Sequence, residues 1–302
     1  MKRSRLTAIA MLTALVSAVS AEPSTESPHH ELEKGWVDLF PKGIEGWETY
    51  LGPPHHSVDL PGIGKGRRGE ERKPVGLNKD PKKVFNFIEF EGKPTLYITG
   101  EIFGAITTLA EYENYHISLR VKWGKKKWPP RAHLLRDSGL LIHCFGEHGE
   151  TSGFWMNSVE CQVQETDCGD LWLLGTAAEV PHTTRVEKVN GESKEIRTYN
   201  KDAEPAPGIR HVEHGPSEED LTGWNTVEVY TLGATSVFVV NGQPNMAVFN
   251  SRRKDNEAPV TKGRIQLQSE GAEVYYQDVK LRPISAFPDH LEPYLKPLAA
   301  KP

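Results

Sequence analysis

Acidic and amide side chains alternate with apolar ones in residues 158–165, SVECQVQE. In an extended strand, Glu160, Gln162 and Gln164 share one face, and the apolar residues between them share the other. Carboxylates and carboxamides form hydrogen bonds with hydroxyl groups, so this face has the chemistry of a sugar-binding cleft. We expect Glu160 to act there as an acid or base, and Gln162 and Gln164 to bind substrate.

A second polar row occurs in residues 263–270, GRIQLQSE. Gln266, Gln268 and Glu270 alternate with the residues between them in the same way, and a core-facing aliphatic residue precedes each of the two glutamines. Two such strands fit the concave sheet of one β-sandwich. We therefore expect Gln268 and Glu270 to bind substrate in the same cleft as Glu160.

His143 and Glu165 are the candidates for the catalytic partner of Glu160. His143 lies one residue off the apolar face of the run 140–145, and a lone histidine in a strand is more often structural than catalytic. Direct pairing of this run with residues 158–165 would, however, bring His143 close to Glu160. Glu165 is five residues from Glu160, so it reaches the same face only through a β-bulge.

Asp167 and Trp172 follow this strand, and we assign both to substrate binding. A divalent cation could be held by His143 together with one of the acids Glu160, Glu165 or Asp167. No spacing here matches a recognised metal-binding motif, so the sequence assigns no metal and leaves the cofactor open.

Short strand-like runs recur along the chain between glycine and proline turns, and no convincing amphipathic helix occurs. Asn241-Gly242 lies between two apolar runs and favours a tight hairpin turn. The pattern predicts an all-β fold, a jelly-roll β-sandwich of two antiparallel sheets with long loop insertions.

Residues 1–21 combine a basic start, a short apolar stretch and a small-residue cleavage site, as in a secretory signal peptide. The apolar part is too short to span a membrane comfortably, and no lipoprotein-type cysteine follows it. We expect a secreted or periplasmic protein without a membrane span.

The rest of the chain is expected to contain one large β-domain at residues 35–284. Residues 22–34 are predicted to form a disordered leader, and residues 285–302 a loosely packed tail. Residues 52–83 and 175–222 are rich in glycine, proline or charge, and we expect them to be insertions in the domain.

The formal net charge is −5, and loss of the three basic residues of the signal peptide changes it to about −8. This acidic balance argues against nucleic acid as a partner. The three cysteines, Cys144, Cys161 and Cys168, leave at least one thiol free or intermolecular, and their pairing cannot be deduced. The oligomeric state is not indicated either.

The spacing E-x-Q-x-x-E, formed by Glu160, Gln162 and Glu165, partly resembles the E-x-D-x-x-E motif of laminarinase-type glucanases of jelly-roll fold. Gln162 replaces the aspartate and cannot take over its electrostatic role. A retaining pair of carboxyl groups about 5–5.5 Å apart is therefore possible here but not favoured.

Several motifs together resemble the 3-keto-disaccharide hydrolase domain family, exported β-sandwich proteins with a concanavalin A-like fold. The resemblance rests on GWVDLF at residues 35–40, the G-x-x-x-T segment 104–108, DSGLL at 137–141 and GRIQLQ at 263–268. It extends over nearly all of the chain after the leader, from residue 35 to residue 284.

Three positions depart from the family pattern. Asp137 stands where the family usually has asparagine, and His143 stands near the position of an arginine. Glu270 occupies the place of a histidine. If that histidine is catalytic in relatives, either Glu270 replaces it here or the mechanism differs.

The resemblance implies cleavage of 3-keto-glycosides, which can be argued chemically. A ketone at C3 acidifies the C2 proton, so a base can remove it while an acid assists the departure of the oxygen on C1, and water can then add. We assign the acid–base role to Glu160, with His143 or Glu165 as its partner. A bound cation could polarise the ketone.

Two alternatives remain open. The same cleft could belong to a lectin-like carbohydrate-binding protein of the cell envelope that performs no chemistry. The chain could also be a cell-envelope interaction protein in which residues 175–222 bind another protein. Turnover would identify the enzyme, and sugar binding without turnover would identify the lectin-like protein. Indifference to glycans would identify the interaction protein.

Overall fold

The computed structural model describes residues 35–189, 191–208 and 210–296. The expected signal peptide and leader lie outside the described residues. Nearly all of the described chain forms strands, and the last element is the short 3-10 helix η1 (Asp289–Tyr294). Within these residues no helix has the length and hydropathy needed to cross a bilayer.

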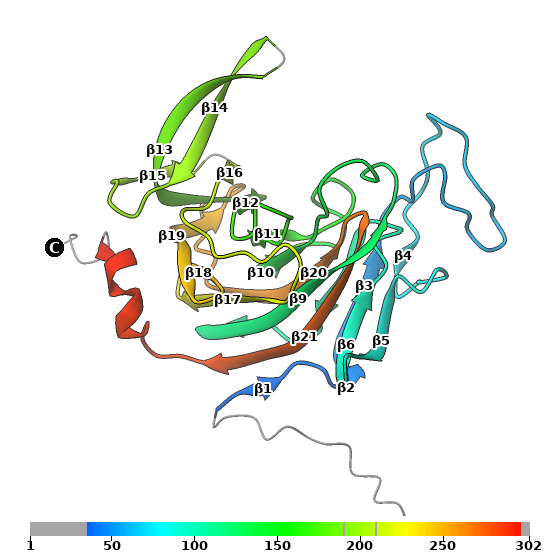
Figure 1. Cartoon of the computed structure of the whole chain (residues 1–302), viewed down its shortest axis with the longest axis horizontal. Coiled ribbons are helices and arrows are strands. Elements are labelled where there is room, and N and C mark those ends of the chain that lie inside the picture. The colour runs from blue at the N-terminus through cyan, green and yellow to red at the C-terminus, as the bar shows by residue number, and fades with distance from the viewer. Residues whose placement is uncertain (1–34, 190, 209, 297–302) are drawn as a thin grey trace, which may run out of the picture. The chain divides into compact units, whose positions relative to one another are not determined.

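The larger of the two sheets has eleven strands, and its named pairs are all antiparallel (Figure 1). The order along the sheet is β14 (Glu192–Tyr199), β13 (Thr176–Val189), β19 (Gln243–Arg253), β18 (Thr235–Val240), β17 (Asn225–Leu232), β9 (Tyr115–Lys127), β21 (Ala272–Pro283), β6 (Lys93–Ile98), β5 (Phe85–Phe90). Two short strands extend it: β1 (Val37–Asp38) pairs with β21, and β15 (Pro205–Gly208) pairs with β13.

The second sheet has nine strands, again antiparallel. Its order is β16 (His211–Val212), β12 (Leu171–Leu174), β11 (Asn157–Gln162), β10 (Gly139–Phe145), β20 (Lys262–Ser269), β7 (Gly104–Thr108), β3 (Trp47–Leu51), β4 (Gly76–Leu77). The short strand β8 (Tyr112–Glu113) pairs with β20, and β2 (Pro41–Ile44) lies between β1 and β3 in the chain.

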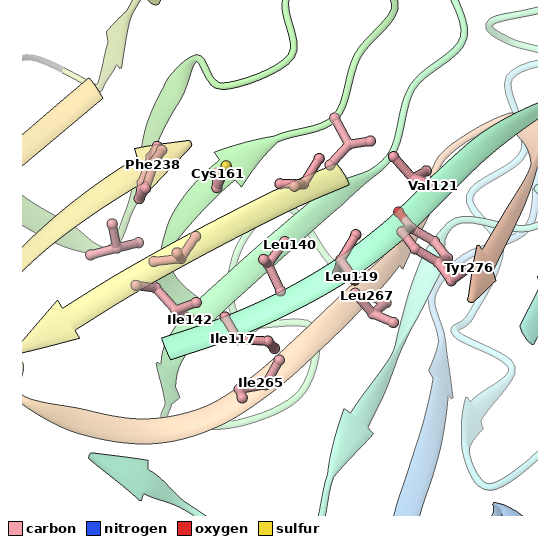
Figure 2. Close-up of a cluster of buried hydrophobic side chains, with 14 of the residues drawn as sticks. Ile117, Leu119, Val121, Leu140, Ile142, Cys161, Phe238, Ile265, Leu267 and Tyr276 are labelled. Atoms are coloured by element: carbon pink, nitrogen blue, oxygen red, sulfur yellow. The ribbon is translucent and has the colours of Figure 1, made fainter. Parts of the chain in front are cut away.

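Side chains of the two sheets meet in one hydrophobic core (Figure 2). The larger sheet contributes alternate residues of β9, such as Ile117 and Leu119, and the smaller sheet contributes Leu140, Cys161 and Leu267. All five are fully buried. Burial of an aliphatic side chain stabilises the fold by about 1.5–3 kcal/mol, so this alternation holds the sheets face to face.

The predicted jelly-roll β-sandwich of two antiparallel sheets is confirmed. The two runs that carry the candidate residues pair directly, as β10 and β11, with Leu141 opposite Glu160. The polar row near the C-terminus lies on β20, the other neighbour of β10. The three strands are therefore adjacent at the centre of the smaller sheet.

The segment 175–222, expected to be an insertion, contains strands β13 to β16, and Ala178 and Val180 are buried in the core. Its polar composition has a physical reason. The β13–β14 hairpin extends beyond the rest of the sheet (Figure 1). The first half of β14 is exposed on both faces. The segment 52–83, in contrast, contains only β4.

Two further findings concern the cysteines and the tail. Cys144, Cys161 and Cys168 are all buried and free. The tail after residue 284 was expected to be loosely packed, yet Leu291 of η1 is fully buried in the core. The end of the described chain is therefore anchored on the sandwich.

Candidate functional site

One row of side chains crosses the outer face of the nine-stranded sheet, because consecutive members are register partners on neighbouring strands. We call it the polar row. It comprises His211, Trp172, Glu160, Leu141, Gln266, Thr107 and Glu48. The residues that alternate with it, such as Leu140 and Leu267, point into the core. The same alternation that builds the core therefore places Glu160 on the opposite face, in the middle of the sheet.

Glu160 is almost completely buried, with 4% of its surface exposed. Burial and the nearby Asp137 carboxyl raise its pKa well above the ordinary value, against a hydrogen bond from the Gln268 side chain and the charge of Arg210. A Cβ atom on Gly139 would overlap Glu160 Oε1 and lie 2.6 Å from Gln268 Oε1. Glycine at this position therefore leaves the space in which the carboxyl and the amide meet.

Arg131 joins two further acids beside Glu160. Its Nη2 atom lies 2.5 Å from Asp137 Oδ2, and its Nη1 atom lies 3.7 Å from Glu270 Oε1. Burial raises the pKa of Asp137 to about 7, although Arg131 opposes the shift. Burial and the neighbouring carboxyls of Asp137 and Glu160 raise the pKa of Glu270 well above its usual range. We call Asp137, Glu160, Glu270 and Arg131 the acid cluster.

The acid cluster contains polar atoms without partners. Among the described residues, Asp137 Oδ1, Gln268 Oε1 and Arg131 Nε are buried and make no hydrogen bond. Buried polar groups are normally paired, and exceptions often mark a site that a ligand or water completes. Two acceptors and one donor of this cluster are therefore left unsatisfied by the described residues.

Gln164 and Asp167 support this arrangement from the loop after β11. Gln164 Oε1 accepts a hydrogen bond from Arg131 Nη2 at 2.6 Å. The Gln164 side chain also donates to Asp167. Gln164 therefore holds the guanidinium at Nη2, and Asp167 holds Gln164, whereas Glu270 lies nearer Nη1.

Trp172 and Gln162 flank Glu160 on the same sheet. Trp172 is the register partner of Glu160, and its ring stacks on His211 with ring centroids 4.4 Å apart. Gln162 pairs in register with Gly139, and its Oε1 accepts from the Val163 amide at 3.1 Å. Both predicted binding residues therefore lie next to the acid cluster.

The structure joins neither His143 nor Glu165 to Glu160. The strand is irregular between Ile142 and Phe145, and His143 has a φ of +52°. Its ring consequently lies in the interior, perpendicular to that of Tyr115 at a centroid distance of 5.7 Å. Burial lowers its pKa to about 4.

Glu165 forms an ion pair with Arg136, with 2.7 Å between Oε1 and Nη2. The hydrogen bonds from Arg136 lower the pKa of this carboxyl. The bulge that would turn Glu165 toward Glu160 is not present in the described register of β11, which ends at Gln162. The catalytic roles predicted for His143 and Glu165 therefore stay predictions, and neither residue contacts Glu160 among the described residues.

Sequence reasoning missed Arg131 as a site residue and noted Asp137 and Gly139 only as parts of a motif. Arg131 lies in the loop between β9 and β10, where no periodicity predicts the direction of a side chain. In the described part of the chain, no group of three His, Cys, Asp or Glu side chains is arranged as a metal site.

The protein is a β-sandwich that carries buried acids and amides and a tryptophan on one face of its smaller sheet. The chain belongs to the 3-keto-alpha-glucoside-1,2-lyase-like domain family, whose model matches residues 35–282. The resemblance expected from the sequence motifs is thereby confirmed.

Solved structures with a similar fold include two putative glycosyl hydrolases from Parabacteroides distasonis. One is 18% identical, with 82% of this chain and 99% of that chain covered and a TM-score of 0.44. The other is 16% identical, with 83% and 94% covered and a TM-score of 0.47. A β-glucanase from Bacillus licheniformis is 10% identical, with 83% and 99% covered and a TM-score of 0.38. No curated protein sequence matches the chain significantly.

Proposed function

We propose that the protein is an exported enzyme that cleaves the glycosidic bond of 3-keto-glycosides by elimination, followed by addition of water. The description of its family names a 3-keto-alpha-glucoside-1,2-lyase, which supports the substrate class. The observation that carries the proposal is the acid cluster, in which three neighbouring carboxyl groups have raised pKa values and two of them, Asp137 and Glu270, pair with Arg131.

The proposed reaction needs one group that accepts a proton and one that donates it. The C2–H bond breaks and its proton goes to the base, the C1=C2 double bond forms, and the C1–O bond breaks. The leaving oxygen takes a proton from the acid and departs as an alcohol. Addition of water then places a hydroxyl group on C1 and a proton on C2, which restores a 3-keto sugar.

The electrostatics of the cluster favour one division of roles. Burial raises the pKa of Glu160 well above its usual range, which favours the protonated form, so Glu160 fits the acid. Asp137, with a pKa of about 7, is partly ionised at the same pH and fits the base. The charge of Arg131 stabilises the enolate that forms when the C2 proton leaves.

Binding of the sugar is assigned to the surrounding residues. Gln268, Gln162 and Trp172 border Glu160 and offer amide groups and an aromatic surface. Glu270 contacts Arg131 and faces the same cluster. Gln164 bonds to Arg131 and Asp167 bonds to Gln164, so we assign both to positioning Arg131; the substrate-binding role expected for them stays a prediction.

Export rests on residues 1–21, whose basic, apolar and small-residue segments fit a cleavable signal peptide. The location proposed is the periplasm or the medium. A lectin-like binding protein is the second candidate, because the unpaired polar atoms near Glu160 would bind a sugar even if no bond were broken.

The experiment is incubation of the protein with a 3-keto-glucoside and with its unoxidised parent, each with and without chelator, while aglycone release is measured. We expect release from the keto compound alone, and chelator sensitivity would reveal a required cation. Glu160→Gln should abolish release, and Glu165→Gln is the matched control because it makes the same carboxyl-to-amide change in an ion-paired residue outside the cluster. Sugar binding without release from either compound would establish the binding protein instead.

A further inference from the structure

Asp170 is a buried carboxyl group outside the acid cluster, two residues before Trp172 in the chain, and it is 3% exposed. Its Oδ2 atom accepts a hydrogen bond from His211 Nε2 at 2.8 Å, and its Oδ1 atom accepts one from the His214 backbone amide at 2.7 Å. Burial raises the pKa of Asp170, and the bonds from the two histidines oppose the rise. A buried carboxyl that is bonded at both oxygens fixes the groups attached to it.

The bond from His211 leads to Trp172. The two rings stack with 4.4 Å between their centroids, and the two residues are register partners on β16 and β12. Trp172 is also the register partner of Glu160. Because Nε2 is bonded to Asp170, the imidazole has a fixed orientation against the indole. This first arm therefore holds the indole ring beside Glu160.

The bond from His214 leads to the loop after β11. His214 Nε2 donates to Thr166 O at 3.2 Å, and His214 Nδ1 donates to Gly215 O. An imidazole donates from both nitrogens only as the imidazolium. Burial lowers the pKa of His214, but the Gly215 carbonyl and the charge of Asp170 raise it, and the net shift is upward. This second arm is therefore a charged ring that is bonded to the loop.

The loop carries the residues that hold Arg131. Thr166 Oγ1 and the Gln164 side chain both donate to Asp167. Gln164 Oε1 in turn accepts from Arg131 Nη2 at 2.6 Å. Thr166 has a φ of +76°, a conformation that is rare for a β-branched residue and persists only where the surroundings impose it. The bond to its carbonyl is one such constraint, so hydrogen bonds connect Asp170 to the guanidinium of the acid cluster.

We propose that Asp170 is a positioning residue that acts on two sides of the site. Through His211 it positions Trp172, which binds the sugar. Through His214 it positions Arg131, whose charge stabilises the enolate. The inference rests on the proposed function for these two roles, and Asp170 acts without touching the substrate.

The kinetic test separates the two arms. His211→Phe keeps a ring against Trp172 but removes the bond to Asp170, so KM for a 3-keto-glucoside should rise about tenfold with little change in kcat. His214→Phe removes the bond to Thr166, so kcat should fall about tenfold with little change in KM. Each histidine variant is the control for the other, because a purely structural role would give no such split.

Asp170→Asn should show both effects, because an amide offers one acceptor oxygen to the two histidines. Asp202→Asn is the matched control, since Asp202 is exposed and pairs with Lys201. If Asp170→Asn does not fold, the two histidine variants carry the test. Wild-type kinetics in Asp170→Asn, or the same change of KM and kcat in both histidine variants, would overturn the proposal.

A second measurement needs no turnover. The Nε–H signal of Arg131 in nitrogen-15 NMR, identified by its loss in Arg131→Met, should move in Asp170→Asn and in His214→Phe, although both changes lie several hydrogen bonds away from the guanidinium. It should stay in place in Asp202→Asn. If the signal moves but the wild type releases no aglycone, the proposed function fails and the positioning stands. If aglycone is released and the signal does not move, the positioning fails alone.

Discussion

Gly139 and Glu160 lie against each other on neighbouring strands, so that a methyl group on the glycine would occupy the position of the Glu160 carboxyl oxygen. The φ of Gly139 is not in the left-handed region, and alanine can therefore adopt its backbone. The glycine is required for space alone. Its role is to let Glu160 and Gln268 come together above the sheet.

Gly139→Ala should inactivate the enzyme without unfolding it. The displaced atoms are the ends of two side chains, so we expect a loss of at most about 1–3 kcal/mol in the free energy of unfolding. A displacement of about 1 Å at the reacting groups should lower kcat about 100-fold. Aglycone release and thermal unfolding measure the two effects. Gly208→Ala, where the methyl would lie 3.2 Å from Val180, is the control. Unchanged kcat would contradict the placement of Glu160.

Stability should fall as the pH rises from mildly acidic to neutral. The folded pKa of Asp137 is about 7, above its ordinary value of 3.8, and that of Glu160 is also raised. Their contribution is fully present below the unfolded pKa values and is lost as the pH rises through the folded ones. Denaturant unfolding at pH 4.5 to 8 measures this slope. In Glu160→Gln the slope should be smaller, and an equal slope would show that Glu160 is ionised in the folded protein.

Replacement of Arg131 by methionine should change the pH profile of the reaction. The guanidinium opposes the upward shift in the pKa of Asp137, so its removal should move the rising limb of the profile by about one pH unit or more to higher pH. Arg136→Met is the control because Arg136 pairs with Glu165 outside the cluster. The same profile in wild type and Arg131→Met would argue that Asp137 is not the base.

His143→Asn should leave turnover within about threefold of wild type, because the His143 ring lies in the interior. Asparagine tolerates the φ of +52° at this position. The folded pKa of about 4 lies below the ordinary 6.5, so the stability due to neutral His143 is lost as the pH falls from 6.5 toward 4. In His143→Asn, the free energy of unfolding should no longer show this decrease as the pH falls from 6.5 toward 4. A large drop in kcat in a folded variant would restore His143 as the partner of Glu160.

The sequence alone predicted the parts of the site that depend on strand periodicity. Alternation placed Glu160, Gln162 and Gln268 on one face because the core holds the residues between them. His143 could not be placed in this way, since one irregularity in β10 moves a side chain to the opposite face of the sheet.

Arg131 could not be predicted because its position depends on tertiary contacts. It reaches Asp137 and Glu270 from the loop between β9 and β10, where no periodicity fixes the direction of a side chain. The strands of segment 175–222 were missed for a related reason. Polar residues on both faces of a projecting hairpin carry no alternation, although the base of that hairpin contributes Val180 to the core.

The polar row also links the evolution of the site to that of the fold. Because each strand of the smaller sheet presents alternate residues to the core and to the row, a slip of one residue in β11 would turn Glu160 inward and Val159 outward. No such slip could alter the chemistry and leave the packing intact. New specificities are therefore more accessible through point substitutions at row positions, or through the loop that carries Arg131, than through insertions or deletions within the strands.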